Sequence, residues 1–283
     1  MRIVVTGGSG KAGRWVVREL RERRHDVLNA DLVRDAGPHG SSIAVDLTDL
    51  GQCHDVISGA DAVVHLAAIP APELHAEGET FRNNILSTYN VFSAATVHRV
   101  QRVVWASSET VLGLPFEPLP PAFAPIDESI DPRPESSYAL SKLLGEEMAR
   151  QSSRRSGIPF VGLRISNIME PDDYAAFPGY WDDARLRKWN LWGYVDARDV
   201  AQAVRRGLEA PVGGAVVCII AAADTVMTRP SAELMAEVYP GVPLRRQVQA
   251  RETLLSIERA RQLLGYEPEH SWHEHVAADT DAR

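Results

Sequence analysis

Residues 2–13 read Arg-Ile-Val-Val-Thr-Gly-Gly-Ser-Gly-Lys-Ala-Gly, an apolar segment of strand length that runs directly into a glycine-rich loop. Residues 12–24 have helical length, so the loop connects a strand to the amino terminus of a helix. Glycine permits a tight turn there, and the unpaired N–H groups of the helix terminus attract a pyrophosphate. The predicted phosphate-binding residues are Gly7, Gly10, Lys11, Ala12 and Gly13.

The glycines fit two registers of this kind of loop, Gly8-x-Gly10-x-x-Gly13 and Gly7-x-x-Gly10-x-x-Gly13. They do not fit a P-loop, because Val5 stands where that motif requires its first glycine and Ala12 where it requires serine or threonine. The loop therefore predicts a dinucleotide-binding site.

Segments of strand length alternate with segments of helical length along the first part of the chain. The expected strands are 2–6, 27–30, 42–45, 62–67, 102–106 and 160–164, and the expected helices are 12–24, 50–58, 80–97 and 136–156. The strand segments lack polar alternation, which is typical of parallel strands buried on both faces. We therefore predict an α/β fold with a doubly wound parallel sheet of the Rossmann type, in which ligands bind at the carboxyl ends of the strands.

Two irregular segments interrupt this pattern. Residues 113–134 contain seven prolines, and a loop of that length usually has a function such as walling a site. Residues 170–194 contain seven aromatic residues, which form a lid over a substrate, the packing of a small lobe, or a dimer surface. We expect residues 1–165 to form the dinucleotide-binding domain, with 195–222 returning to it, and residues 166–194 and 223–283 to form a small carboxyl-terminal substrate lobe.

The composition is that of an ordinary folded protein, with 283 residues and a formal net charge of −8. This acidic balance argues against a nucleic-acid partner. Cys53 and Cys218 lie far apart in or beside apolar segments, which favours free thiols in a reducing cytoplasm. The longest apolar run, residues 215–223, is too short to span a membrane, so no membrane partner is expected.

A group of three histidines near the end of the chain is the one pattern with some likeness to a metal site. His270, His273 and His275 lie among polar residues without an accompanying cysteine or acidic cluster. We therefore predict no metal.

Asp31 ends the expected second strand, eighteen residues after Gly13. A carboxylate at about this spacing takes the ribose hydroxyls of a bound dinucleotide and repels a 2′-phosphate. The sequence therefore favours NAD over NADP as the cofactor, although Arg34 stands three residues further on. Asp46 ends the expected third strand and is predicted to lie beside the adenine ring.

Tyr138 and Lys142 lie four residues apart, on one face of the expected helix 136–156. Ser107 and Ser108 follow the strand 102–106 at its carboxyl end, where the ligands of such a sheet bind. Lowering the pKa of a phenol from its free value of about 10 to about 7 needs about 4 kcal/mol of anion stabilisation. A nearby ammonium and a bound nicotinamide can supply it in a water-poor cleft. We predict that Tyr138 acts as general acid and base on a substrate hydroxyl, with Ser108 bonded to the same oxygen.

Taken in order, these motifs resemble the extended short-chain dehydrogenases/reductases, the NAD-dependent epimerase/dehydratase group. The matching stretches are Thr6-Gly-x-x-Gly-x-x-Gly13, His65-Leu-Ala-Ala68, Asn83-Asn84, Ser107-Ser108-x-Thr110-Val-x-Gly113, Tyr138-x-x-x-Lys142, Leu163-Arg-Ile-x-Asn167, Tyr194-Val-Asp-x-x-Asp199-Val-Ala and Leu264-Gly-Tyr-x-Pro268. The resemblance implies catalysis by Ser108, Tyr138 and Lys142. It also implies a homodimer formed through helices 80–97 and 136–156.

The same resemblance implies the residues that bind the ligands. The cofactor contacts are Gly7, Gly10, Lys11, Ala12, Gly13, Asp31, Asp46, Leu47, Ala67, Asn84, Tyr138, Lys142 and Ile165, and the substrate contacts are Ser107, Ser108 and Asn167.

The spacing of two landmarks bears on the substrate. Asn167 and Tyr194 are only 27 residues apart, whereas nucleotide-sugar epimerases and dehydratases use a long segment there as part of the nucleotide pocket. A free, small, sugar-like substrate is therefore expected, and the layout is similar to uronate dehydrogenases. Those enzymes carry a carboxylate-binding arginine where this chain has Ala175. We interpret the nearby Arg185, Arg187 and Lys188 as a solvated basic face.

The predicted activity is hydride transfer between NAD and a carbinol or carbonyl carbon of a small sugar or sugar acid. One alternative is a nucleotide-sugar 4-epimerase with tightly bound NAD. The other is a non-catalytic dinucleotide sensor, a class that usually loses the tyrosine or the lysine that this chain retains.

Overall fold

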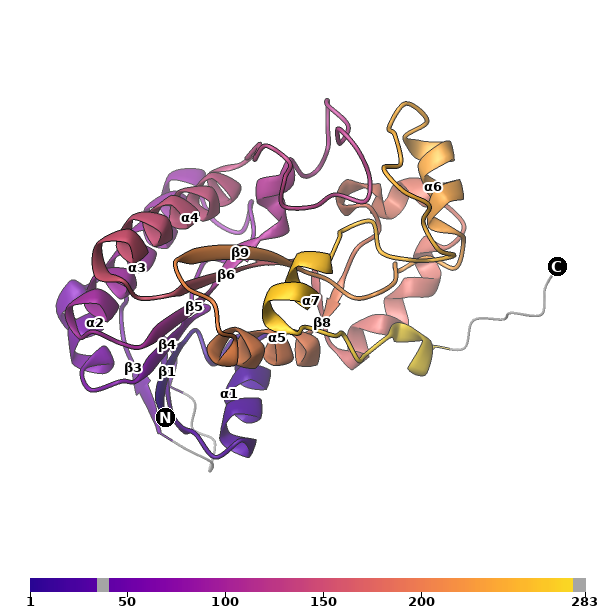
Figure 1. The fold of residues 1–283 in the computed structure, drawn as a ribbon. Coiled ribbons are helices and arrows are strands. Elements are labelled where there is room, and N and C mark those ends of the chain that lie inside the picture. Colours follow the sequence, from indigo (N-terminus) through magenta and orange to yellow (C-terminus); the bar gives the residue numbers. More distant parts are fainter. Residues whose placement is uncertain (35–40, 277–283) are drawn as a thin grey trace.

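Seven parallel strands form the central sheet of the computed structural model, which describes residues 1–34 and 41–276 (Figure 1). The strands are β1 (Arg2–Thr6), β2 (Asp26–Asp31), β3 (Ser42–Ala44), β4 (Ala62–His65), β5 (Arg102–Ser108), β6 (Phe160–Ile165) and β9 (Ala215–Ile220). Their order across the sheet is β3-β2-β1-β4-β5-β6-β9. From β1 the chain first adds β2 and β3 on one side. It then crosses over and adds β4 on the other side of β1. Ligands of such sheets bind where the strand order reverses, here between the carboxyl ends of β1 and β4.

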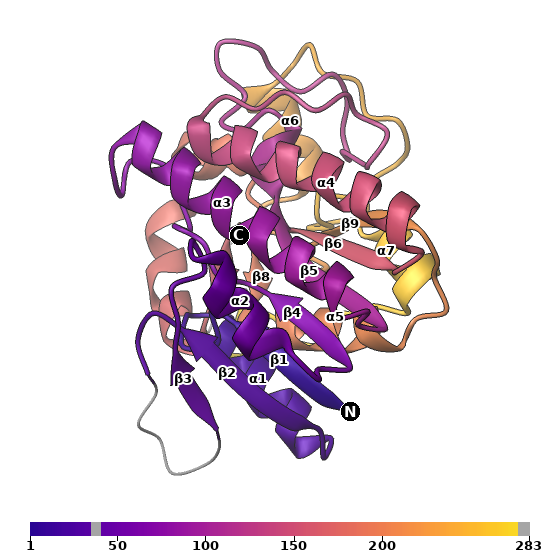
Figure 2. The ribbon, with the colours of Figure 1, turned by 90° about the vertical axis from the view of Figure 1, so that its left-hand side faces the viewer.

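Helices cover both faces of the sheet, as Figures 1 and 2 show. The helices are α1 (Gly13–Glu22), α2 (Leu50–Ile57), α3 (Glu77–Val97), α4 (Ser137–Ser156), α5 (Ala197–Glu209), α6 (Ser231–Val238) and α7 (Glu258–Leu264). One layer contains α2, α3 and α4, and the other contains α1 and α5.

Successive strand residues point to opposite layers. Val4 and Val63 belong to the apolar cluster under α2, α3 and α4, whereas Ile3, Val5 and Val64 belong to the cluster on the other face. Both sets of side chains are buried, which is why the strands lack polar alternation. The predicted doubly wound α/β fold is confirmed.

Two strand ends differ from the predicted bounds by two residues, and both lie at the carboxyl edge of the sheet; the other strand ends agree within one residue. Strand β5 continues through Ser107 and Ser108, because these residues stay in register with Arg164 and Ile165 of β6. Strand β4 ends at His65 rather than at residue 67. The chain turns there so that Ala67 approaches the glycine loop closely.

Helix α4 begins with a serine cap. The Ser136 side chain accepts a hydrogen bond from the Ala139 N–H at 3.1 Å, which satisfies one of the free donors of the first turn. The helix ends at Gly157, which has a left-handed backbone with φ 76°. The cap places Tyr138 in the first turn of the helix and Lys142 one turn later.

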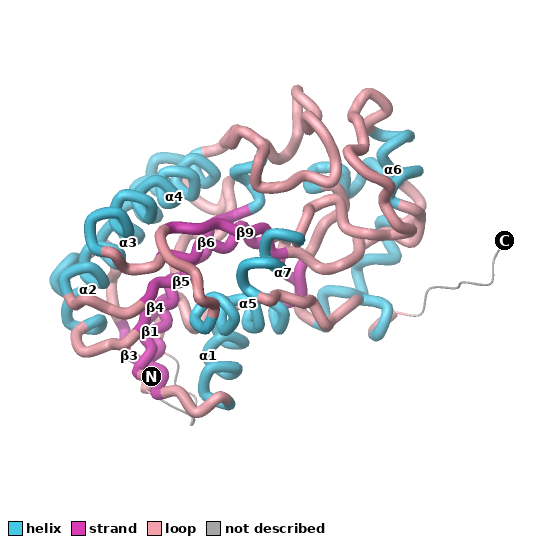
Figure 3. The backbone as a smooth tube through the Cα atoms, in the orientation of Figure 1, coloured by secondary structure: helices cyan, strands magenta, loops and turns pink. Residues whose placement is uncertain are grey.

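The remaining elements lie toward the carboxyl ends of the strands, at the right of Figure 3, except for α7, which packs against β9 and α5. They are the short strands β7 (Ile168–Met169) and β8 (Val195–Asp196), the 3-10 helices η2 (Pro171–Tyr180), η3 (Ala184–Asn190) and η4 (Trp272–Glu274), and helices α6 and α7. The rings of Tyr174, Phe177 and Tyr194 are fully buried and pack edge to face. These three aromatic residues of segment 170–194 therefore form packing rather than a lid.

The proline-rich loop 113–134 lies against the same part of the chain. Ala124 and Ile126 form bridges to Leu244 and Leu255. None of the helices within residues 1–34 and 41–276 has the length and apolar content needed to span a membrane.

A buried ion pair links α4 to the sheet. Arg164 of β6 donates to both carboxylate oxygens of Glu146, at 2.9 and 2.8 Å, and both side chains are only 4% exposed. The Ser107 hydroxyl donates to the same carboxylate at 2.7 Å. Removing one partner of such a pair leaves the other charge buried without compensation.

We expect Glu146→Ala to lower the free energy of unfolding by about 3–5 kcal/mol, because Arg164 then remains buried and unpaired. The matched control is Glu147→Ala, which removes an exposed i,i+3 pair with Arg150 and should cost no more than about 1 kcal/mol. Urea denaturation of both variants checks this. Equal losses would contradict the role assigned to the buried pair.

Candidate active site

The glycine loop is packed tightly against the end of β4. Gly7 has φ +71°, and a Cβ atom on it would lie 2.5 Å from the Ala67 backbone nitrogen. A Cβ on Gly13 would lie 2.0 Å from the Gly7 carbonyl oxygen. The packing of the chain itself therefore requires glycine at both positions. Gly10 differs, because its Cβ would meet only the Gly7 oxygen, at 3.4 Å.

Asp31 lies at the mouth of this loop. Its carboxylate accepts a hydrogen bond from the Ser9 N–H at 2.9 Å, and the Gly7 N–H donates to the Ala30 carbonyl at 3.0 Å. Two of the residues predicted to contact the cofactor, Asp31 and Ala67, are thus brought to opposite sides of the loop by β2 and β4.

Three other predicted cofactor residues take part in local structure near this edge. Asp46 lies two residues beyond β3, is exposed, and accepts from the Thr48 N–H and hydroxyl. Leu47 is buried. Asn84 is buried and binds the Ile69 backbone through both amide atoms, at 2.8 and 3.0 Å. Asn84 therefore fixes the loop that follows β4.

His65 connects the glycine loop to α3. One ring nitrogen lies 2.7 Å from the Thr6 hydroxyl and the other 3.2 Å from the Thr88 hydroxyl. Burial, with a smaller effect of the Lys142 charge, lowers the pKa of His65 to about 3. The ring is therefore neutral and acts as a hydrogen-bonding bridge.

Ser108, Tyr138 and Lys142 converge as predicted, at the carboxyl end of β5 and the first turns of α4. All three are buried. The Lys142 Nζ lies 5.7 Å from the centre of the Tyr138 ring and donates to the Ala106 carbonyl at 2.8 Å. Ile165 pairs with Ser108 in the sheet and lines the same edge.

Burial dominates the ionisation of this group. It raises the pKa of Tyr138 to about 12, with a hydrogen bond from Ser108 opposing the rise and the charge of Glu109 adding to it. It also lowers the pKa of Lys142 to about 8. The ammonium alone therefore does not make the phenol acidic, and the joint effect of the ammonium and a bound nicotinamide stays a prediction.

Ser107 and Ser108 point to opposite faces of β5, because they are adjacent in a strand. The Ser108 hydroxyl accepts from Thr110 at 3.0 Å and faces Tyr138. The Ser107 hydroxyl is used by Glu146 in the buried ion pair. Of the two serines, Ser108 is the one that the structure brings to the tyrosine.

Ionic contacts join the glycine loop to the segment after β6. Lys11 lies 2.5 Å from the Asp173 carboxylate and donates to the Ile168 carbonyl at 3.1 Å. The Glu170 carboxylate binds the Arg14 guanidinium and, at 2.7 Å, the Trp15 indole. Lys11, a predicted phosphate contact, is thus paired with an acid of the opposite segment.

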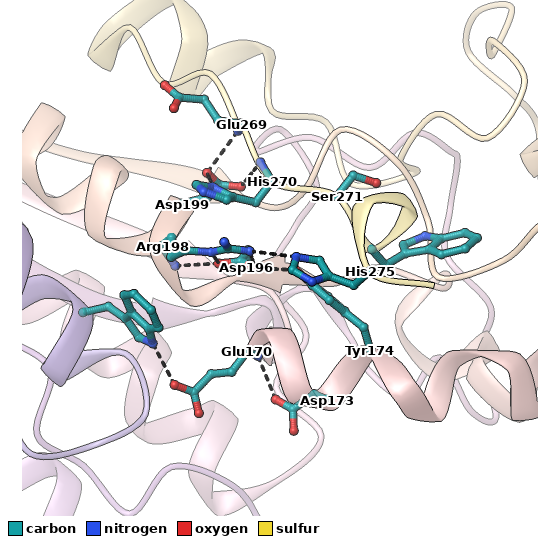
Figure 4. A network of polar contacts seen from close by, with 12 residues as sticks. Glu170, Asp173, Tyr174, Asp196, Arg198, Asp199, Glu269, His270, Ser271 and His275 are labelled. Carbon is teal, nitrogen blue, oxygen red and sulfur yellow. Dashed lines mark hydrogen bonds and ion pairs between the residues drawn. The ribbon is translucent and has the colours of Figure 1, made fainter. Parts of the chain in front are cut away.

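A network further along the same segment holds the end of the described chain (Figure 4). Asp199 accepts hydrogen bonds from the Glu269 and His270 N–H groups and from the His270 ring, at 3.0, 3.1 and 2.8 Å. Asp196 binds Arg198 and the Tyr174 hydroxyl. Within the described ranges, no group of three or more histidines, cysteines or acids is arranged to hold a metal.

Sequence reasoning missed a buried polar cluster beside Ser108. Glu109, the next residue, is 3% exposed. Its carboxylate accepts from the Ser166 hydroxyl at 2.6 Å and from the Asn190 amide at 3.2 Å. These partners are 57 and 81 residues away, so no local pattern could have indicated them.

Arg187 is also part of this cluster, and its interpretation as a solvated residue is wrong. Its side chain is buried between the rings of Tyr180 and Trp189, at 5.3 and 5.0 Å, and donates to the Asn167 side chain at 3.3 Å. Of its neighbours in sequence, Arg185 is exposed. The predicted substrate residue Asn167 is therefore held by a buried cation.

Comparison with known proteins agrees with this geometry. A model of the NAD dependent epimerase/dehydratase family matches residues 3–220. A uronate dehydrogenase of Pseudomonas putida is 33% identical over 225 residues, which are 76% of this chain and 75% of the relative. An L-arabinose 1-dehydrogenase (NAD(P)(+)) of Haloferax volcanii is 31% identical over 79% of this chain and 89% of the relative.

A solved structure extends the likeness to the whole fold. A short-chain dehydrogenase/reductase superfamily protein from Agrobacterium tumefaciens, solved with bound NAD, superposes with a TM-score of 0.75 and 25% identity. The superposition covers 97% of this chain and 94% of that one. The predictions of the family and of NAD as its cofactor are confirmed, and the chain belongs to the NAD dependent epimerase/dehydratase family of extended short-chain dehydrogenases/reductases.

Proposed function

We propose that this protein oxidises a small sugar or sugar acid at a carbinol carbon with NAD, reversibly. The observation that carries the proposal is the convergence of Ser108, Tyr138 and Lys142 beside the glycine loop, at the edge where the strand order reverses. Relatives named as uronate and L-arabinose dehydrogenases support a sugar-like substrate.

The glycine loop fits a pyrophosphate. Gly7 and Gly13 are required by the chain's own packing, whereas a side chain at Gly10 would meet no tight protein contact. Because the protein's own packing does not require glycine at position 10, a glycine there suits the close approach of a pyrophosphate to the protein backbone. The phosphates would be held by Gly7, Gly10, Lys11, Ala12 and Gly13. Asp31 would take the adenosine ribose, which favours NAD over NADP. Asp46, Leu47, Ala67 and Ile165 would line the rest of the cofactor.

When bound, NAD supplies the hydride acceptor and a positively charged ring. The Ser108 hydroxyl would hold the substrate oxygen, and the Tyr138 phenolate would take its proton. From a pKa of about 12, the phenol needs roughly 7 kcal/mol of anion stabilisation to ionise at neutral pH. Lys142 would supply part of it by turning from the Ala106 carbonyl toward the phenolate.

The substrate would lie between this group and the lobe formed by residues 166–194 and 223–276. Asn167 would face it, held by Arg187. Segment 167–194 is folded into η2 and η3 with a packed aromatic interior, which leaves little chain to enclose a nucleotide. This favours a free sugar over the nucleotide sugar that a 4-epimerase would require.

We also propose that the protein is a homodimer of the cytoplasm. Helices α3 and α4 pack side by side and present one face outward (Figure 2). Both helices carry large exposed apolar residues, Tyr89 and Val97 on α3 and Leu140 and Leu144 on α4, and residues of both helices line a groove that includes Tyr89 and Val97. Such a patch suits an interface with a second copy. The two described cysteines are free and buried, which suits a reducing compartment.

Gly10→Ala should leave the free energy of unfolding within about 0.5 kcal/mol of the wild type but weaken NAD binding at least about tenfold, because the new methyl group faces the ligand. The control Gly13→Ala should cost about 1–3 kcal/mol of stability, because its Cβ would overlap the Gly7 carbonyl. Thermal unfolding and NADH fluorescence titration separate the two effects. Unchanged NADH affinity in Gly10→Ala would contradict the proposed cradle.

Tyr138→Phe should lower kcat by about 10²–10⁴ because the general base is lost, while NADH affinity stays within about twofold. The assay is NADH appearance over a panel of free aldoses, uronic acids and their lactones, with Tyr89→Phe as a matched tyrosine control. UDP-galactose and UDP-glucose are included, because a 4-epimerase interconverts them without net NADH. If no compound is turned over faster by the wild type than by Tyr138→Phe, the dehydrogenase proposal fails.

Leu144→Glu should raise the dimer dissociation constant at least about tenfold, because it places a charge in the proposed apolar interface. Leu186→Glu is the matched control, since Leu186 is exposed on η3 outside that face. Sedimentation velocity at several concentrations measures the change. A wild-type protein that sediments as a monomer would refute the α3–α4 interface.

A further inference from the structure

Glu109 joins three parts of the fold around the catalytic serine. It opens the 3-10 helix η1 (Glu109–Leu112) immediately after Ser108, the last residue of β5. Its carboxylate accepts from Ser166 just after β6 and from Asn190 at the end of η3, and it also receives the Asn167 backbone N–H. One buried side chain therefore connects the catalytic strand to both ends of the segment that would face the substrate.

The charges around Glu109 come from two elements. From η3, the Arg187 guanidinium favours the ionised carboxylate. On α4, the pKa of Tyr138 is raised by the negative charge of Glu109. The Lys142 ammonium lies over the same tyrosine ring. His65 near Lys142 is neutral, because burial keeps its pKa far below its usual range.

Burial and the neighbouring groups have opposite effects on the pKa of Glu109. Desolvation raises its pKa to about 7, while the bonds from Ser166 and Asn190 and the charge of Arg187 oppose the rise. When it is ionised, its negative charge raises the pKa of Tyr138. The geometry therefore gives Glu109 two separable effects, one through its reach and one through its charge.

We propose that Glu109 is a positioning residue for hydride transfer: its carboxylate holds Ser166, Asn167 and Asn190 in place against the Ser108–Tyr138 pair, and its negative charge opposes formation of the tyrosine phenolate. The inference rests on the proposed dehydrogenase function for its kinetic consequences. The structural contacts on which it is built do not depend on that function.

Two substitutions separate the two effects. Glu109→Gln keeps the length of the side chain and can still bond Ser166, because a hydroxyl both donates and accepts. It removes the charge, so the acid limb of kcat/KM for sugar oxidation should move to lower pH by on the order of one unit, the size expected for a nearby charge at an effective dielectric constant of about 20. KM should stay within about twofold.

Glu109→Asp keeps the charge but shortens the reach to Ser166 and Asn190. The acid limb should stay in place, while kcat/KM falls about tenfold to a hundredfold as the substrate-facing residues lose their position. A merely structural role would lower stability in both variants and move the pH profile in neither. An acid limb unmoved in Glu109→Gln overturns the proposal.

A direct titration keeps the test independent of turnover. 3,5-Difluorotyrosine, whose phenol ionises more readily than that of tyrosine, is incorporated at position 138 and titrated by ¹⁹F NMR in the wild type and in each variant. Its pKa should fall in Glu109→Gln and stay unchanged in Glu109→Asp. If none of the tested sugars supports NAD reduction by the wild type, the proposed function fails. This titration then still decides the effect of the Glu109 charge.

Glu146→Gln is the matched control, since Glu146 is an equally buried carboxylate that also binds a serine. Glu146 lies eight residues beyond Tyr138 on α4, roughly 12 Å along the helix axis, so its replacement should shift the pKa of the phenol at position 138 less than Glu109→Gln does. An equal shift in Glu146→Gln and Glu109→Gln would overturn the proposal, because the effect would then belong to any buried acid. Thermal unfolding establishes that each variant is folded under the titration conditions.

Discussion

The reversal of strand order between β1 and β4 is the constraint on which the site depends. Parallel strands end at one edge of the sheet, and the reversal opens that edge between the two strands. The glycine loop follows β1, Ala67 follows β4, and Ser108 ends β5. The sheet topology therefore brings residues that are distant in sequence together, and no ligand is needed to do so. The fold provides the place, and the side chains at the strand ends decide the chemistry.

Burial decides the electrostatics of that place. Three ionisable groups lie close together out of water, and each is displaced toward its neutral form: the pKa of Tyr138 and of Glu109 rises and that of Lys142 falls. All three shifts have the same leading cause, the loss of solvation of a charge. A site of this kind carries little net charge by itself. A positive group that enters the site interacts strongly with these ionisable groups, because the low dielectric constant strengthens electrostatic interactions.

The parts of the fold and the site that were predictable depend on short-range patterns. The strand-loop-helix at residues 2–24, the serines at the end of β5, and the four-residue spacing of Tyr138 and Lys142 are each contained in a single element and its cap. Their convergence follows from a parallel sheet, whose strands all end at one edge. The buried cluster of Glu109, Ser166 and Asn190 was not predictable, because the partners of Glu109 lie 57 and 81 residues away in the sequence. Arg187 was misjudged for a related reason: a charged residue in a polar, aromatic segment has the same local pattern whether it is solvated or enclosed by Tyr180 and Trp189.

Two kinds of contact join segment 166–194 to the rest of the fold, and they differ in strength. Lys11 with Asp173 and Arg14 with Glu170 are ion pairs in which at least one side chain is well exposed, and such pairs contribute about 0–1 kcal/mol each. The contacts of Glu109 are fully buried, and the loss of one leaves a polar group without water or partner. The position of the segment is therefore set mainly from inside, next to Ser108. The outer pairs lie over the glycine loop and can exchange partners at little energetic cost. Lys11 can therefore leave Asp173 without displacing the segment that Glu109 holds.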